Sequence, residues 1–244
     1  MNQIKQDAIR NALRAQEAEQ RKNDLIVYLA HDLKTPLTSV IGYLTLLHDE
    51  RQISEELQSK YLSVALDKAE RLEDLINELF EITRFNLSQI SLEVSQVNLT
   101  RMLEQIMFEF QPILAEKNLK ISLECPDNLE IKLDGNLMER VFDNLIRNAV
   151  HYSFNNTTID IVVKEEPHQV NLFFQNQGNT IPQDKLDRIF EQFFRLDPSR
   201  ATQTGGAGLG LAIARQLTEA HHGTIKAYSE NETIEFRVTL PRVN

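Results

Sequence analysis

The sequence predicts an α + α/β protein, in which a helical hairpin is followed by an α/β domain with a mixed sheet. Residues 1 to about 88 contain one proline and one glycine, Pro36 and Gly42, whereas the residues from about 91 onward contain the other six prolines and seven glycines. Apolar residues recur at helical spacing in the first part, and short alternating stretches interrupt helical ones in the second. Because glycine and proline punctuate short elements, this shift predicts two domains.

Two long apolar stripes in the first part predict two helices. The first stripe contains Leu25, Leu29, Leu33, Leu37, Val40, Leu44 and Leu47, and the second contains Leu62, Ala65, Leu66, Ala69, Leu72, Leu75, Ile76, Leu79 and Ile82. The segment DERQIS (49–54) separates them, with Ser54 as the expected N-cap and Glu55 and Glu56 in the first turn that follows. Because an antiparallel hairpin cannot bury both wide stripes alone, we expect a homodimer in which two hairpins form a four-helix bundle.

The start of the chain carries a thinner, alanine-rich helical stripe. Two interpretations stay open, a solvent-exposed helix end and a two-stranded coiled coil that leads into the hairpin. We therefore expect three segments: a signalling helix or linker over residues 1–24, the hairpin over 25–88 and the α/β domain over 91–244.

The second part alternates between strand and helix patterns. Six stretches predict strands: LKISLEC (119–125), LEIKLD (129–134), TIDIVV (158–163), VNLFF (170–174), TIKAYS (224–229) and TIEFRVTL (233–240). Helical patterns cover residues 99–116, 137–152, 185–190 and 209–222. Most strands are joined by short turns, which predicts a mixed sheet with helices on one face.

Composition excludes several classes of function. The net charge is −10, from 26 basic and 36 acidic residues, and an acidic chain repels nucleic-acid backbones, so we expect no nucleic-acid partner. The single cysteine, Cys125, cannot build a disulfide framework or a cysteine-rich zinc site. No apolar run reaches the roughly 20 residues that cross a bilayer, and the N-terminus lacks the apolar core of a signal peptide. We expect a cytosolic chain or the cytosolic part of a larger protein.

His31 is the first candidate for chemistry, because it lies off the apolar stripe in AHDLKTPLTS and next to Asp32. Asp32 can accept the Nδ1 proton and leave Nε2 as a nucleophile. Pro36 inside a helical pattern costs about 3 kcal/mol or more, which indicates that a kink is useful here. Thr35 lies one turn from His31, where its hydroxyl either holds a water or bonds to a carbonyl freed beside the kink; both interpretations stay open.

Two further motifs suit a phosphate ligand. In DNLIRNAVHYS, Asn144 and Asn148 lie on one flank of an apolar helical stripe, and amide oxygens can complete a Mg²⁺ shell, although such a pair is more often a solvated face. In TGGAGLGLAIARQL, a glycine-rich turn opens a helix, where free N–H groups and the helix dipole favour phosphate. This turn lacks the Gly-Lys-Ser/Thr of a Walker loop. The irregular stretch 190–204 before it indicates a lid, with Arg195 and Arg200 as its cations.

These motifs together resemble those of the sensor histidine kinases of two-component systems. HDLKTP is similar to their phosphoacceptor box, NLIRNA to their N box, FEQFFR to their F box and GGAGLGL to their second glycine box, in the family's order within residues 25–240. The sequence around the motifs is most similar to that of the vancomycin-resistance sensor kinases. The resemblance implies a dimerisation and histidine-phosphotransfer hairpin, followed by an ATP-binding α/β sandwich of the type shared with gyrase and Hsp90.

The resemblance also implies roles for single residues. It implies that His31 is phosphorylated from ATP, that Asp32 is its acid–base partner, and that Thr35 positions the water that removes phosphate from a response regulator. It implies Asn148 as the Mg²⁺ ligand, and as ATP-binding residues Asn144, Asn148, His151, Tyr152, Asn176, Gly178, Ile181, Arg195, Gly206, Gly208, Leu209 and Gly210. The implied partners are a second copy of the chain and a response-regulator receiver domain, with the membrane reached only through an N-terminal sensor segment that this chain does not contain.

The first glycine box departs from the family pattern. The family has Asp-x-Gly-x-Gly, where the aspartate accepts from the adenine amino group, and this chain has Asn176-Gln177-Gly178-Asn179-Thr180. Asparagine keeps an acceptor oxygen but loses the charge. Two alternatives follow: a dimeric scaffold with a weak nucleotide site that acts mainly as a phosphatase, and a chaperone or mismatch-repair ATPase, which HDLKTP disfavours. The sequence leaves open whether phosphorylation occurs within or between protomers.

Overall fold

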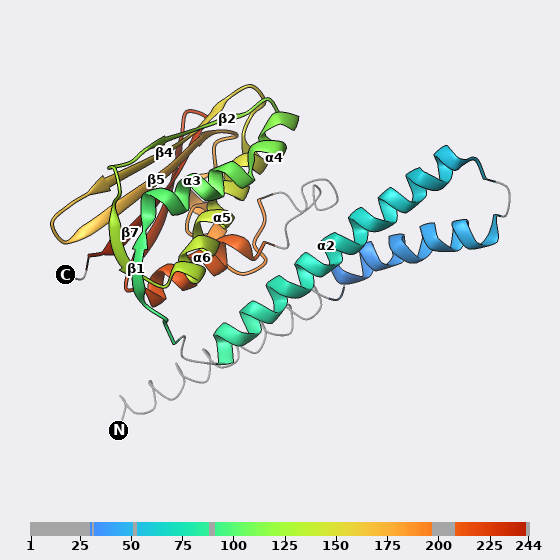
Figure 1. Cartoon of the computed structure of the whole chain (residues 1–244), viewed down its shortest axis with the longest axis horizontal. Coiled ribbons are helices and arrows are strands. Elements are labelled where there is room, and N and C mark those ends of the chain that lie inside the picture. The colour runs from blue at the N-terminus through green and yellow to red at the C-terminus, as the bar shows by residue number, and fades with distance from the viewer. Residues whose placement is uncertain (1–29, 31, 51–52, 88–90, 197–207, 243–244) are drawn as a thin grey trace. The chain divides into compact units, whose positions relative to one another are not determined.

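The computed structural model describes residue 30 and residues 32–50, 53–87, 91–196 and 208–242. The chain divides into two compact units, Met1–Glu81 and Ile82–Asn244 (Figure 1).

The first unit contains a helical hairpin, as predicted. Residues 30 and 32–49 are helical, and α2 extends over Glu55–Leu87. The backbone N–H of Leu57 donates to Oγ of Ser54 at 3.3 Å, and two glutamates occupy the first turn of α2. The predicted N-cap at Ser54 is therefore confirmed. The first helix continues through Pro36, whose side chain is buried.

The two helices of the hairpin bury few apolar side chains. Ala65 and Leu75 are buried, and the rings of Tyr43 and Tyr61 contact each other across the hairpin with centroids 5.5 Å apart. Large apolar side chains are exposed on both helices: Leu37, Ile41, Leu44, Leu46, Leu62, Leu66 and Ile76. The wide stripes predicted from the sequence are thus left open by a single copy of the hairpin.

The second unit is built on a five-stranded mixed sheet with the order β2-β4-β5-β7-β6 (Figure 1). Its strands are β2 (Lys120–Glu124), β4 (Thr158–Glu165), β5 (Gln169–Gln177), β6 (Thr224–Glu230) and β7 (Thr233–Pro241). β2 and β4 are parallel, and the other neighbours are antiparallel. A separate antiparallel pair joins β1 (Ser95–Asn98) to β3 (Glu130–Leu133).

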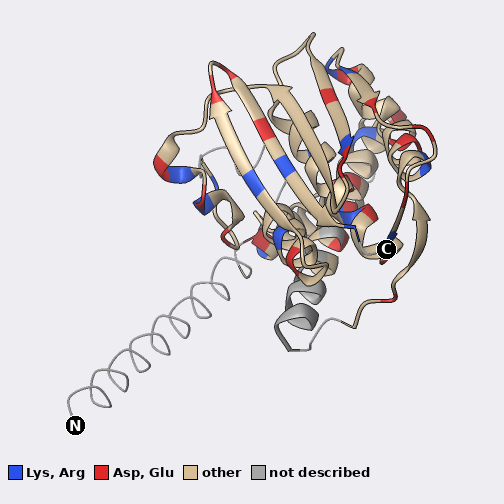
Figure 2. Cartoon of the chain, turned by 90° about the vertical axis from the view of Figure 1, so that its left-hand side faces the viewer, with Lys and Arg blue, Asp and Glu red and all other residues tan. Residues whose placement is uncertain are grey.

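Helices cover one face of this sheet, and the other face is open. The covering helices are α3 (Leu99–Glu109), α5 (Gly135–Tyr152) and α6 (Gly210–Ala220), with the short α4 (Gln111–Glu116) after α3 (Figure 1). Phe142 of α5 stacks on Phe174 of β5 with centroids 5.9 Å apart, and both are fully buried. Figure 2 shows charged residues along the strands of the open face. The prediction of a mixed sheet with helices on one face is confirmed.

Two local predictions were wrong, and one strand was not predicted. The helix expected over residues 99–116 is two helices, because the chain turns at Phe110 and Pro112 starts the next one. The helix expected over 185–190 is two short 3₁₀ turns, Gln183–Lys185 and Arg188–Phe190, since a segment this short forms too few hydrogen bonds to sustain an α-helix. β1 has a polar, four-residue sequence with no strand signal, and its pairing with β3 decides its conformation.

Candidate functional site

The helix that carries both candidate asparagines, α5, is anchored at its two ends. At its start, Asp134 is the N-cap: one carboxylate oxygen accepts from Leu137 N–H at 3.2 Å and the other from Glu93 N–H at 2.9 Å. At its end, Nζ of Lys117 donates to the carbonyls of Val150 and His151 at 2.9 and 2.8 Å. A cation at the helix C-terminus also interacts favourably with the helix dipole. The position of the α5 flank is therefore fixed from outside the motif.

A histidine supports the N-terminal anchor of α5. Nε2 of His221 accepts from the backbone N–H of Asp134 at 3.1 Å, so Nδ1 carries the proton and donates to the carbonyl of Leu217 at 2.8 Å. Asp134 and His221 are both buried. Neither they nor Lys117 stood out in the sequence, because each lies outside the motifs and only the folded chain brings it to α5.

The start of α6 lies directly against Asn144. A Cβ on Gly210, the first residue of α6, would lie 2.7 Å from Oδ1 of Asn144, so any other residue here would displace the asparagine side chain. The N-cap residue, the fully buried Leu209, provides no side-chain hydrogen bond to the first N–H groups of α6. Helix N-termini without such a cap present N–H groups and the positive end of the dipole to an anion. Asn148 lies one turn after Asn144 and is half-buried like it.

The end of α5 brings three more predicted residues together. The rings of His151 and Tyr152 are 4.9 Å apart and nearly perpendicular. Burial raises the pKa of the Tyr152 hydroxyl, and the positive charge of Arg195 opposes this shift. Arg195 of the predicted lid is therefore close enough to act electrostatically on the end of α5.

Gly178 is held tightly beside the end of α5. It forms an isolated antiparallel bridge with Ser153, and a Cβ at this position would lie 2.5 Å from the carbonyl oxygen of Tyr152. Its N–H donates to the carbonyl of Glu232 at 2.8 Å. The next residues are fixed as well: Oγ1 of Thr180 accepts from Glu232 N–H, and the N–H of the buried Ile181 donates to Oγ of Ser229. Thr180, which departs from the family pattern, thus anchors the turn between β6 and β7.

Asn176 lies near the end of β5, two residues before Gly178, and is 2% exposed. Its Oδ1 and Nδ2 are both buried, and neither has a hydrogen-bond partner within the described part of the chain. A buried polar group without a partner typically costs about 1–3 kcal/mol. Such a group in a folded protein calls for a water, an ion or a ligand that completes it.

The second glycine segment is locked to the F-box residues. Gly208 has φ +74°, a conformation that favours glycine, and a Cβ there would lie 3.0 Å from backbone atoms of Phe193 and Phe194. Phe193, with φ +65°, donates its N–H to the carbonyl of Gly208 at 2.9 Å. Gly206 and Arg200 lie outside the described residues.

The phosphoacceptor segment belongs to the other unit. His31 lies outside the described residues. Asp32 is half-buried, Thr35 is exposed, and Oγ of Ser39 donates to the Thr35 carbonyl at 3.1 Å.

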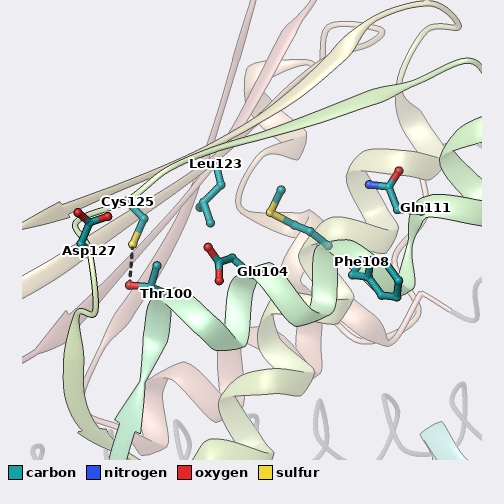
Figure 3. Close-up of a pocket in the computed structure, with 8 residues that line it drawn as sticks. Thr100, Glu104, Phe108, Gln111, Leu123, Cys125 and Asp127 are labelled. Carbon is teal, nitrogen blue, oxygen red and sulfur yellow. Dashed lines mark hydrogen bonds between the residues drawn. The ribbon is translucent and has the colours of Figure 1, made fainter.

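A groove of about 390 Å³ lies elsewhere, between α3 and β2 (Figure 3). Its lining includes Thr100, Glu104, Phe108 and Cys125, and it contains no predicted site residue. Burial and the charges of Glu104 and Asp127 raise the pKa of the Cys125 thiol, while its hydrogen bond with Thr100 lowers it. The thiol therefore stays protonated at neutral pH and is a poor nucleophile.

The described residues contain neither a cluster of metal-binding side chains nor a membrane-spanning helix. Within them, no group of three or more His, Cys, Asp or Glu side chains is placed to hold a metal ion. A cation at Asn148 would therefore not have a cluster of these side chains from the described residues as further ligands. The same residues contain no helix whose length and hydropathy would let it span a bilayer.

Two family models match the chain. Residues 21–87 match the His Kinase A (phospho-acceptor) domain, and residues 133–244 match the histidine kinase-, DNA gyrase B- and HSP90-like ATPase. The chain is 51% identical over 242 residues to the sensor protein VanSC of Enterococcus gallinarum, covering 99% of this chain and 67% of that protein. The chain belongs to the sensor histidine kinases.

Other relatives of this sensor histidine kinase agree with the assignment. It is 45% identical over 241 residues to the sensor protein VanS of Enterococcus faecium, covering 99% of this chain and 62% of that protein. The solved structure of histidine kinase ThkA in complex with the response regulator protein TrrA has a TM-score of 0.74, at 22% identity, covering 93% of this chain and 64% of that one. The predicted fold class, the predicted enzyme class of protein-histidine kinase and the resemblance to the vancomycin-resistance sensors are confirmed.

The family models also divide the candidate residues. The phospho-acceptor model contains His31, Asp32 and Thr35, and the ATPase model contains every candidate nucleotide residue from Asn144 to Gly210. The α/β domain of this sensor histidine kinase is therefore its ATP-binding domain.

Proposed function

We propose that this chain transfers the γ-phosphoryl group of ATP to Nε2 of His31 and then to an aspartate of a response-regulator receiver domain. The observation that carries the proposal is the site around α5, where the buried amide of Asn176 has no partner among the described residues and the uncapped start of α6 lies against Asn144. These are the features that a bound nucleotide would complete.

Within this site we assign roles by position. Asn176, Gly178, Ile181 and Tyr152 surround the base at the end of β5 and α5. Asn144 and His151 on α5, Arg195 of the lid, and the backbone of Gly206, Gly208, Leu209 and Gly210 face the phosphate chain. Asn148 would hold Mg²⁺ through its amide oxygen, and the bound ion would supply charge neutralisation.

The hairpin would supply the nucleophile. Nε2 of His31 attacks the γ-phosphorus, the bond from that phosphorus to the bridging oxygen breaks, and ADP leaves. Asp32 holds the Nδ1 proton and keeps Nε2 free to react. In the opposing phosphatase reaction, Thr35 would position the water that hydrolyses the receiver's aspartyl phosphate.

The partners and the cellular setting are part of the proposal. The exposed leucines of the hairpin support a homodimer, and the structure of ThkA in complex with the response regulator protein TrrA supports a response regulator as the second partner. The names VanSC and VanS support a role in glycopeptide-antibiotic resistance. We propose the cytoplasmic portion of a membrane-bound sensor protein, divided into a signalling helix or linker (1–24), a phosphotransfer hairpin (25–88) and an ATP-binding domain (91–244).

A scaffold that acts mainly as a phosphatase is the second candidate function. Its support was the departure from the family pattern at Asn176 and Thr180. Because the Thr180 hydroxyl accepts from Glu232, that substitution has a structural use, and only Asn176 continues to favour the alternative.

The decisive experiment is incubation with γ-labelled ATP and Mg²⁺. We expect a label that is labile in acid and stable in base, as a phosphohistidine is. His31→Gln should abolish labelling while ATP still binds. The matched control is His48→Gln, because His48 is also on the hairpin and also precedes an aspartate, with Nδ1 2.9 Å from Oδ1 of Asp49. Label that survives in His31→Gln, or is lost in His48→Gln, would contradict the assignment.

A further inference from the structure

Two buried asparagines on β5 differ in one respect. Asn171 is held at both ends of its amide: Nδ2 donates to Glu166 at 2.9 Å, and Oδ1 accepts from Oγ1 of Thr239 at 2.7 Å. Asn176, five residues later and more deeply buried, makes no hydrogen bond with any described residue. The hydrogen bonds therefore fix the orientation of the Asn171 amide. No described residue fixes which of the two orientations the Asn176 amide takes.

The Asn176 side chain lies on the same face of the sheet as α5, the helix that carries several candidate nucleotide residues. Leu172, Phe174 and Asn176 alternate along β5 and share the face that the helices cover. Beside the amide stands Gly178, where even a Cβ would lie 3.4 Å from Nδ2 of Asn176. The same Cβ would lie 2.5 Å from the carbonyl oxygen of Tyr152, so glycine at this position lets the end of α5, with the candidate nucleotide residue Tyr152, lie close to the amide.

The chemistry of an amide differs from that of a carboxylate at such a position. An ionised carboxylate only accepts, so it pairs with the 6-amino group of adenine and is repelled by the 6-oxo group of guanine or hypoxanthine. An amide pairs with adenine by accepting from the amino group and donating to N1. Turned over by rotation about its last torsion, it donates to a 6-oxo group and accepts from the N1–H beside it.

We propose that Asn176 makes the nucleotide site of this kinase accept 6-oxopurine nucleoside triphosphates, inosine and guanosine triphosphate, as well as ATP. No protein hydrogen bond from the described residues must be broken to turn the amide over. The bound base alone therefore selects its orientation. This inference rests on the proposed function, because it assigns Asn176 to the base of the bound nucleotide.

The test is competition binding with the full chain. A fluorescent ATP analogue labelled on its ribose is displaced by ATP, inosine triphosphate and guanosine triphosphate in turn. The variant Asn176→Asp restores a carboxylate, and Asn171→Asp is the matched control on the same strand. Inosine triphosphate lacks the 2-amino group of guanine. It therefore tests recognition of the 6-oxo group separately from any steric effect of the 2-amino group.

For the wild type and for Asn171→Asp, we expect the Kd for inosine triphosphate to lie within about tenfold of the Kd for ATP. For Asn176→Asp, we expect the preference for ATP over inosine triphosphate to be larger by about 100-fold or more. The reason is that a site built for one hydrogen-bonding pattern strongly rejects the other. A wild-type preference for ATP of more than about tenfold overturns the inference, whether or not Asn176→Asp folds, and leaves the proposed function standing. Failure of the chain to bind ATP at all overturns both.

Discussion

The hairpin and the α/β domain bury their apolar side chains to very different extents. On the hairpin, Leu62 is 49% exposed and Leu66 is 59% exposed. In the α/β domain, Phe142 and Phe174 are 0% exposed and Phe236 is 1% exposed. A sheet covered by helices encloses a core within one chain, whereas two helices form a single layer that leaves one face of each open.

This difference separates what each region needs in order to function. The α/β domain can bind its ligand as a single copy, because its site lies on elements that it packs itself. We expect the hairpin to gain a core when a second copy covers its exposed leucines. We therefore expect changes in one region to leave the stability of the other largely intact, and the following variants are ordered from the largest expected effect to the smallest.

The strongest test introduces a charge into the exposed stripe of the hairpin. Leu66→Glu should convert the dimer to monomers, because burying a leucine typically contributes about 1.5–3 kcal/mol and burying an unpaired carboxylate is far more costly. Sedimentation velocity measures the oligomeric state. The matched control, Gln58→Glu, adds the same charge at an exposed polar position of α2 and should leave the dimer intact. A dimeric Leu66→Glu protein would mean that the exposed stripe is not the dimer interface.

The next test alters the nucleotide site alone. Asn148→Asp should lower the rate of autophosphorylation by about 100-fold or more, because it places a negative charge where phosphate must bind and changes the ligand offered to Mg²⁺. Labelling of His31 measures the effect, and thermal unfolding should change little at this half-buried polar position. Asp143→Asn, on the same helix and paired with Arg147 rather than with the site, is the control. Near-normal labelling in Asn148→Asp would remove this residue from the metal site.

The third test concerns the anchor of α5. Lys117→Met removes both hydrogen bonds to the helix C-terminus and should lower the free energy of unfolding of the α/β domain by about 1–3 kcal/mol. Denaturant titration measures this change. Lys117→Arg, which keeps the charge and the donors, should recover part of it. If Lys117→Met is as stable as the wild type, water replaces the lysine without cost and the anchor is dispensable.

The smallest expected effect is on the hairpin's second activity. Thr35→Ala should slow removal of phosphate from the response regulator by about tenfold, equivalent to about 1.4 kcal/mol, because a positioned water is lost. Labelling of His31 should persist, because the threonine hydroxyl takes no part in that step. Helicity measured by circular dichroism controls for the neighbouring Pro36. Equal losses of both activities in a folded variant would show that Thr35 is structural.

The periodicity of apolar residues in the sequence predicted most of the helices and strands. The alternation of β4, β5 and β7 and the apolar stripe of α5 are local patterns, and each element formed close to where its pattern lies. The misses have different causes. β1 exists because β3 is beside it, so it could not be read from a short stretch of sequence, whereas the break at Phe110 had a local signal in Pro112 at the start of α4.

The site divides in the same way. The motifs by themselves determined which residues are candidates and which family they resemble, because the chemistry of phosphate requires glycines, amides and a nucleophile in a set order. Only the tertiary structure decided that Lys117, Asp134 and His221 hold α5, that Thr180 anchors a turn, and that the amide of Asn176 is buried without a partner among the described residues. The physical reason is that a motif specifies groups along one segment, whereas burial and hydrogen bonding depend on segments that only folding brings together.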